Sequence, residues 1–132
     1  MILVDTNVWV DLIADDVEWQ PWSLQQIRLA SLRDRLAINA VIYAELSAKY
    51  REQSELDNFL APTRTEVVPI SNEAAFLAGK AFATYRERKG VKTGVLPDFF
   101  IGAQAQAEGW TLLTRDPGRY KTYFSGVKLI CP

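Results

Sequence analysis

Short apolar segments alternate with longer amphipathic segments along this chain, and the alternation predicts an α/β fold. The first apolar run, residues 2–4, is too short for a helix and ends directly at a carboxylate, so we expect a buried strand there. Four later segments have the same character. The five predicted strands are residues 2–4, 36–39, 66–70, 111–114 and 127–130.

Residues that cap or stop helices set the expected helix boundaries. Ser23 and Ser71 can each cap the first turn of a helix. Gly90 can end the second of these helices, and Pro97 suits the first turn of the next. One helix is expected to follow Asp5. The others are predicted over residues 23–34, 40–51, a segment ending near 60, 72–89 and 97–109, with loops at 15–22 and 91–96.

Short buried strands separated by helices are typical of a parallel sheet that is covered on both faces. We therefore expect a three-layer α/β/α sandwich. The 132 residues suffice for one hydrophobic core, and the chain shows no repeat, low-complexity tract or linker. The sequence thus predicts a single α/β domain over residues 1–132.

The amino-acid composition narrows the chemistry that is available. The chain is 48% hydrophobic and 23% charged, as ordinary globular domains are. It contains no histidine, which excludes Ser-His-Asp and Cys-His catalytic sites, imidazole general bases and histidine-ligated zinc. Acid–base or metal chemistry must therefore depend largely on carboxylates, and oxygen ligands suit hard cations such as Mg²⁺ or Mn²⁺.

The chain carries no sign of a membrane or a secretory route. Its apolar runs are too short to span a bilayer, and the N-terminus does not resemble a signal peptide. The one cysteine, Cys131, has no intrachain partner for a disulfide, so we expect a cytoplasmic location. The formal net charge of −1 gives no global basic field, although a local basic patch could still contact nucleic acid.

Four carboxylates lie where a strand ends or where a helix is otherwise apolar. Asp5 and Asp116 follow the first and fourth predicted strands, and ligands bind at the carboxyl ends of the strands of a parallel sheet. Glu45 lies among mostly apolar helical neighbours, and Asp98 begins a helix with a small, apolar face. Four converging carboxylates would repel one another unless a cation neutralised them. The pattern therefore indicates a divalent-metal site.

Each of these acids also has a purely structural explanation, which remains open at this point. Asp5 and Asp98 could stabilise helix N-termini. Glu45 could pair with Lys49 one helical turn away, and Asp116 could belong to a turn with Pro117 and Gly118.

Four short motifs, in this order, resemble those of the PIN domain. They are Val4-Asp5-Thr6-Asn7-Val8, Ala44-Glu45-Leu46, Pro97-Asp98-Phe99-Phe100-Ile101 and Leu113-Thr114-Arg115-Asp116. The whole chain is similar to VapC, the toxin of bacterial and archaeal toxin–antitoxin pairs, and its segment 119–124 also resembles that group. The resemblance covers essentially all 132 residues and implies a PIN-like fold with a five-strand parallel sheet between helices.

The resemblance implies endonucleolytic cleavage of RNA that depends on Mg²⁺ or Mn²⁺. We expect Asp5, Asp98 and Asp116 to hold the metal, and Glu45 to bind a second metal or orient the attacking water. Thr6, Asn7 and Thr114 match the positions that support the acids. The implied partners are the RNA substrate and a small antitoxin that blocks the site and can itself bind DNA, so no specific DNA binding is expected of this chain alone. Homodimers are also common in the group.

Basic and aromatic side chains are candidates for contact with RNA. Arg115 lies between Thr114 and Asp116 and could contact the scissile region. Arg88, Lys89 and Lys92 belong to a basic run that could bind phosphates or could simply form a solvated helix end. Trp19 and Trp22 could contact a partner, whereas Trp9 and Trp110 are expected to pack in the core.

Two enzyme classes with a similar beginning fit less well. A phosphatase of the haloacid dehalogenase type needs a second aspartate at position seven, where this chain has Asn7. A phospho-receiver module needs an acidic pair and a late lysine that are not visible. The alternative that remains is a PIN-like binding or regulatory module without catalytic activity.

Overall fold

The computed structural model describes residues 1–88, 90–91 and 94–132. The strands are β1 (Ile2–Val4), β2 (Leu36–Asn39), β3 (Glu66–Val68), β4 (Thr111–Leu113) and β5 (Leu129–Ile130). The helices are α1 (Thr6–Ile13), α2 (Gln20–Arg33), α3 (Ala40–Ser47), α4 (Gln53–Leu60), α5 (Asn72–Glu87), α6 (Leu96–Glu108) and α7 (Gly118–Tyr123), with a short 3-10 helix, η1 (Ala61–Thr63), after α4.

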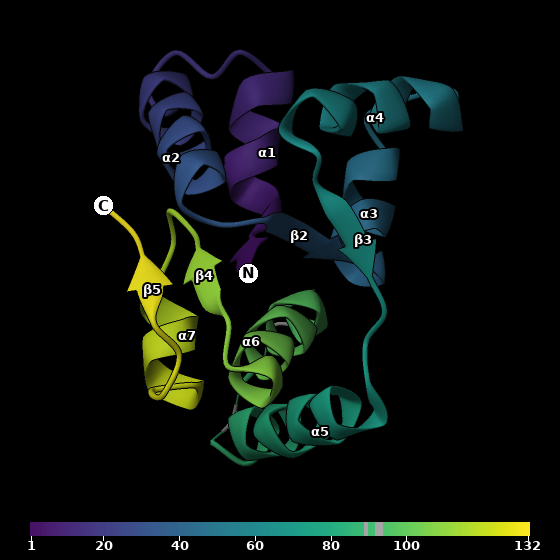
Figure 1. The fold of residues 1–132 in the computed structure, drawn as a ribbon. Helices are drawn as coiled ribbons and strands as arrows, with labels where there is room; N and C mark the ends of the chain where they lie inside the picture. The colour runs from purple at the N-terminus through teal and green to yellow at the C-terminus, as the bar shows by residue number, and fades with distance from the viewer. Residues whose placement is uncertain (89, 92–93) are drawn as a thin grey trace.

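The five strands form one sheet in the order β3-β2-β1-β4-β5, and every neighbouring pair is parallel. Figure 1 shows α1, α2 and α4 on one face of this sheet and α5, α6 and α7 on the other. The predicted parallel five-strand sheet between helix layers is therefore confirmed. Because β1 is the central strand, the residue that follows it lies in the middle of the carboxyl edge.

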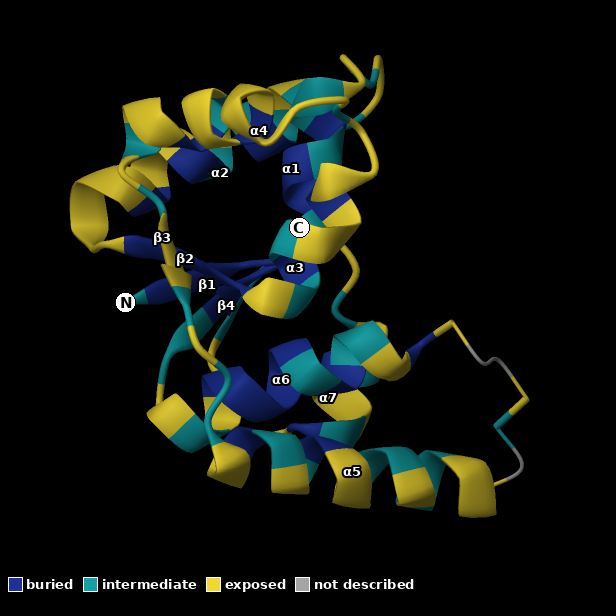
Figure 2. Ribbon diagram, turned by 90° about the vertical axis from the view of Figure 1, so that its right-hand side faces the viewer, coloured by how far each residue is buried: buried dark blue, intermediate teal, exposed yellow. Residues whose placement is uncertain are grey.

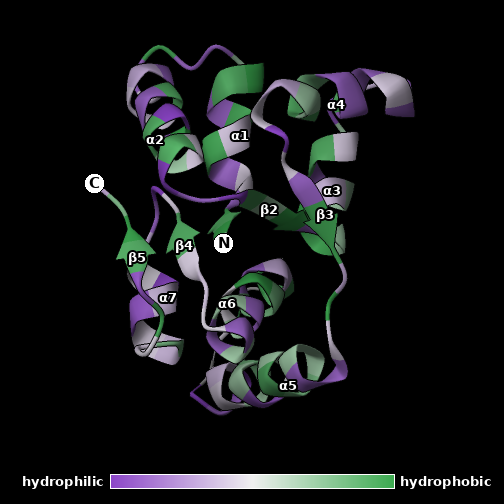
Figure 3. Ribbon diagram, viewed as in Figure 1, coloured by the Kyte–Doolittle hydropathy of each residue, from purple (hydrophilic) through white to green (hydrophobic). Residues whose placement is uncertain are grey.

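The hydrophobic core lies on both faces of the central strands. All residues of β1 and β2 are buried, as the dark blue strands in Figure 2 show. The same strands are green, and so hydrophobic, in Figure 3, whereas the helices mix both kinds of residue. Trp9 is buried as expected, and so are Leu56 and Leu60, two apolar residues of α4. Core packing accounts for these two leucines.

A series of hydrogen bonds between buried polar groups connects α3, α6 and the segment after β3, near the carboxyl edge of the sheet. Asn39, the last residue of β2, caps α3 by accepting a hydrogen bond from the Ile42 amide at 3.0 Å. Its side-chain amide donates to Gln104 of α6 at 2.8 Å, and Gln104 donates to the Pro69 carbonyl at 2.9 Å. Asn39 and Gln104 are both buried, so these bonds fix α6 relative to α3 and to the segment after β3.

Several helix boundaries differ from the prediction. Ser71 caps α5 as expected, but α2 begins at Gln20 rather than Ser23, because Pro21 presets the backbone of the first turn. Ser23 instead lies buried inside α2. α3 ends at Ser47 rather than near residue 51, and α7 was not predicted because six residues are too few for a visible helical period.

No helix in the ranges that the structure describes is both long and hydrophobic enough to cross a membrane.

Two glycines allow a matched test of the packing of α6. A Cβ on Gly102 would overlap the ring of Phe124, which follows α7, whereas a Cβ on Gly79 of α5 would meet no atom within 4 Å. We expect Gly102→Ala to lower the free energy of unfolding by about 1–3 kcal/mol through overpacking. Gly79→Ala should raise it by about 0.5–1 kcal/mol through helix propensity.

Urea unfolding of both variants measures these changes. Equal stabilisation by the two substitutions would contradict the close packing of α6 against Phe124.

Candidate metal site at the carboxyl edge of the sheet

The central position of β1 brings the first and fourth sequence motifs side by side. Val4 is paired with Leu113 in the sheet, and the Asp5 amide donates to the Leu113 carbonyl at 2.9 Å. The side chains of Asp5 and Thr114 therefore meet at the point where their strands end. This juxtaposition is the one that the carboxyl-edge argument predicted from the sequence.

Asp5 is 4% exposed, and four groups donate hydrogen bonds to its carboxylate. Oδ1 accepts from the Thr6 amide at 2.7 Å, which makes Asp5 the N-cap of α1. Oδ2 accepts from the Thr114 and Tyr120 hydroxyls at 2.8 and 2.9 Å, and from the Asn7 amide at 3.3 Å. Asp5 therefore caps α1 and at the same time lies in the candidate metal site.

Burial dominates the electrostatics of Asp5. It raises the pKa of the carboxyl to about 6, against an ordinary value of 3.8, although the hydrogen bonds from Thr114, Tyr120 and Thr6 lower it in part. The nearby charge of Asp98 also contributes to this raised value. The same acids, together with burial, raise the pKa of the Tyr120 hydroxyl well above its usual value, so Tyr120 is a donor toward Asp5.

The three supporting positions from the sequence lie around Asp5. Thr114 also accepts hydrogen bonds from the Asp116 amide at 3.1 Å and from the Asn7 side chain at 3.3 Å. Thr6 directs its hydroxyl to Glu45 of α3, to which it donates at 2.7 Å. One threonine thus joins Asp5 to the loop of Asp116, and the other joins α1 to Glu45.

Glu45 is exposed, although most of its helical neighbours are apolar. The pairing with Lys49 that would have explained it structurally is not formed, since no ion pair of these two residues occurs in the described part of the chain. Its contact is with Thr6 instead, directly after Asp5. Glu45 therefore lies at the rim of the same edge.

Asp98 stands in the first turn of α6 and is half-buried. Burial raises the pKa of its carboxyl, the ion pair with Arg119 lowers it, and the charge of Asp116 raises it. Arg119 Nη1 lies 2.5 Å from Asp98 Oδ2. Asp116 is exposed at the mouth of the site.

The four acids share one electrostatic environment, but they do not yet surround one point. The charge of Asp98 acts on Asp5 and that of Asp116 acts on Asp98. Among residues 1–88, 90–91 and 94–132, no three acidic or thiol side chains already form a metal-binding cluster. Asp98 is instead paired with Arg119, and Glu45 with Thr6.

Arg115 is held away from the open edge by an acid that we did not identify from the sequence. Asp11 of α1 is 1% exposed and binds the guanidinium in a two-point ion pair, at 2.8 Å to Nε and 3.0 Å to Nη2. Ser23 donates to the same carboxylate at 2.7 Å, and Trp19 lies 5.4 Å from the guanidinium. This geometry favours a role for Arg115 in positioning the loop between Thr114 and Asp116.

The other basic candidates are only partly described. Arg88 is exposed, and its guanidinium lies 5.6 Å from the ring centre of Tyr123. Lys89 and Lys92 lie outside the described residues. The roles of Arg115, Arg88, Lys89 and Lys92 in RNA binding stay predictions.

Sequence reasoning missed Asp11, Arg119 and Tyr120. Asp11 carried a usable signal, since it is the one charged residue within the apolar stretch from Val8 to Ile13. Arg119 and Tyr120 gave no comparable signal, because their contacts depend on α7 folding back against the end of β1 and the start of α6.

Asp5→Asn should stabilise the metal-free protein. The pKa of Asp5 is higher in the folded than in the unfolded state. The unfolding free energy of the protein therefore falls by about 2–3 kcal/mol as the pH rises from below 4 to above 6. Asparagine keeps the N-cap and carries no charge. Urea unfolding in chelator should show Asp5→Asn to be more stable than the wild type at pH 7.5 and this advantage to vanish below pH 4. Asp116→Asn, at an exposed position, should not reproduce it.

Arg115→Met tests whether this arginine positions the loop. It leaves the buried Asp11 carboxylate without its cation, which should cost about 3 kcal/mol in unfolding free energy. Adding Asp11→Asn should restore part of this loss. The exposed pair of Arg35 and Glu66 is the control, since Arg35→Met should cost less than about 1 kcal/mol. Unchanged stability of Arg115→Met would leave Arg115 available to RNA.

The family model of the PIN domain matches residues 2–125 of this chain. Solved structures with the same fold include that of VapBC2 from Rickettsia felis bound to a DNA fragment from the promoter of these proteins. It is 24% identical in sequence, with a TM-score of 0.75, and the match covers 100% of this chain and 99% of the other. VapBC-1 from nontypeable Haemophilus influenzae follows at 18% identity and a TM-score of 0.71, over 99% and 98%.

A toxin–antitoxin complex from Klebsiella pneumoniae is similar at 26% identity and a TM-score of 0.60, over 98% of this chain and 96% of that one. No curated protein sequence matches the chain. The family model spans all four acidic motifs, from Asp5 to Asp116. This chain therefore belongs to the PIN domain family.

Proposed function

We propose that this protein is a Mg²⁺- or Mn²⁺-dependent endoribonuclease, with Asp5, Glu45, Asp98 and Asp116 as its acidic site. The observation that supports the proposal is the burial of Asp5 directly after the central strand, under the electrostatic influence of Asp98 and joined through Thr6 to Glu45. A purely structural N-cap does not require a second and a third acid nearby.

The residues present fit a hard divalent cation. Their donors are carboxylate oxygens, supported by the hydroxyl and amide groups of Thr6, Asn7 and Thr114. Asp5, Asp98 and Asp116 would hold the cation, which would relieve the repulsion that raises the pKa of Asp5 and of Asp98. Because the Arg119 guanidinium pairs with Asp98, the cation would either bind the Asp98 carboxylate beside this guanidinium or displace it.

The cation would supply positive charge that makes water easier to deprotonate and that offsets charge developing on the phosphodiester. The protein residues would orient the reactants. Thr114 and Tyr120 fix the Asp5 carboxylate through hydrogen bonds to the same oxygen. Glu45, exposed at the rim and held by Thr6, can orient the attacking water or bind a second cation. Arg119 can contact a phosphate once Asp98 binds the cation.

We further propose that the chain acts as one domain over residues 1–132, and that it is the toxin of a type II toxin–antitoxin pair in the cytoplasm. The similar solved structures are VapBC structures and a toxin–antitoxin complex, which supports an antitoxin as the partner of this chain. In our proposal this partner is small and covers the acidic edge. The second candidate, a PIN-like module that binds partners without cutting RNA, would retain the fold and partner binding. Cleavage separates the two.

Purified, partner-free protein should cut a labelled mixed-sequence RNA in Mn²⁺ or Mg²⁺ and should not cut it in chelator. Asp5→Asn and Asp98→Asn should each lower the rate by at least about 100-fold, because each removes a charge from the cation site. Glu108→Gln, at the opposite end of the helix that carries Asp98, should cut like the wild type.

Calorimetric titration with Mn²⁺ gives a second readout on the same proteins. Weaker binding by Asp98→Asn but not by Glu108→Gln supports the metal site independently of substrate. Folded protein that binds Mn²⁺ but cuts no RNA would favour the non-catalytic module.

A further inference from the structure

A cavity of about 320 Å³ opens directly beside the acidic site, where α5, α6 and α7 meet. We call it the tyrosine pocket, after two of its lining residues. Asp98 and Asp116 form its side toward the metal site, and Tyr85, Tyr123, Arg119 and Thr122 form much of the remainder. A molecule held at the two acids can therefore extend into this pocket without leaving the protein surface.

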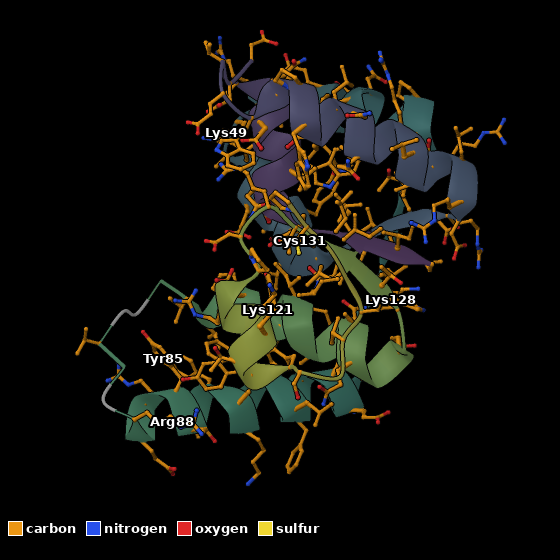
Figure 4. All side chains as sticks on the ribbon, turned by 90° about the vertical axis from the view of Figure 1, so that its left-hand side faces the viewer. Lys49, Tyr85, Arg88, Lys121, Lys128 and Cys131 are labelled. Atoms are coloured by element: carbon orange, nitrogen blue, oxygen red, sulfur yellow. The ribbon has the colours of Figure 1, made fainter. Side chains whose placement is uncertain are left out.

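The aromatic part of the pocket is packed and preorganised. The rings of Tyr85 and Tyr123 lie 6.1 Å apart in an edge-to-face arrangement. Phe99, which is fully buried, lies 5.5 Å from the ring of Tyr85 and 5.2 Å from that of Tyr123. Figure 4 shows Tyr85 between α5 and α7. Because the core holds both rings in place, a flat ligand that replaces the guanidinium now lying over a ring can stack there at little entropic cost.

Two arginines accompany the two tyrosines. The Arg119 guanidinium lies 5.8 Å from the ring centre of Tyr85, and that of Arg88 lies 5.6 Å from the ring centre of Tyr123. Aromatic rings combined with arginines are the usual means of binding unstacked bases and their phosphates in single-stranded RNA. Arg119 lines the pocket itself, whereas Arg88 lies against Tyr123 outside the lining, and both stand near acids that would otherwise repel a polyanion.

We infer that the tyrosine pocket seats the base of one nucleotide adjacent to the phosphodiester held at the acidic edge. The inference rests on the proposed ribonuclease function and adds to it the position of a base and the form of the RNA. A base inside a duplex is stacked on its neighbours and cannot enter the pocket. The preferred substrate is therefore single-stranded at this nucleotide.

The test measures binding of single-stranded RNA decamers that carry one 2-aminopurine at successive positions. Every protein also carries Asp5→Asn, so that the RNA stays intact, and Asp5 does not line the pocket. Stacking should quench the fluorescence at one position. Tyr85→Leu and Tyr123→Leu should each weaken binding about 5- to 100-fold, the usual range for loss of one base stack. Tyr85→Phe and Tyr123→Phe keep the ring and should weaken binding less than the leucine variants do.

Phe76→Leu is the matched control, because Phe76 is an exposed aromatic residue of the same helix and does not line the pocket. It should leave RNA binding unchanged. An abasic nucleotide at the quenched position should weaken binding by the parent but not weaken it further in the leucine variants. The same decamers annealed into duplexes should bind less tightly.

Parent protein that shows no position-dependent quenching and no effect of any abasic nucleotide would overturn the inference, even if the leucine variants fail to fold. Leucine variants that fold and retain full affinity would also overturn it and would leave the pocket to a protein partner. Because the assay measures binding, ring-dependent quenching in the Asp5→Asn background together with no RNA cleavage by the wild-type protein would refute the proposed catalysis alone.

Discussion

The buried carboxylate of Asp5 is the constraint on which the site depends. Its carboxylate belongs to the residue directly after the central strand and is almost fully withdrawn from water, where an unneutralised charge is costly. Four donors from α1, from the residue after β4 and from α7 converge on it, and Thr6 extends the arrangement to Glu45. Side chains far apart in sequence are thereby held around one group that a cation would stabilise.

The remaining charges near this edge are arranged in two ways. Asp11 has its cation within the protein, since Arg115 binds it at two points and fixes the loop that leads to Asp116. Asp98 is paired with Arg119 at the opening of the tyrosine pocket, where a ligand could exchange with the guanidinium. The geometry of Arg115 thus favours a structural role, while Arg119 stands where we propose that the metal, the phosphate and the base meet.

The PIN fold accounts for why short motifs suffice to build such a site. The parallel order β3-β2-β1-β4-β5 places the ends of β1 and β4 next to each other, and the chain leaves both strands at the same edge. The buried bonds between Asn39, Gln104 and Pro69 then set α6, and with it Asp98, relative to α3. The acids can be exposed or half-buried because the backbone beneath them is fixed.

The sequence by itself determined the parallel sheet and its strands, and it singled out the four acids that we propose as the site. These follow from local patterns: apolar runs of strand length, capping residues, and carboxylates directly after strands. Only the tertiary structure decided that Asp11 binds Arg115, that Arg119 binds Asp98, and that Tyr120 reaches Asp5. The start of α2 and the existence of α7 were also beyond the local pattern. These contacts join elements as many as 115 residues apart, and no local periodicity records which distant side chains meet.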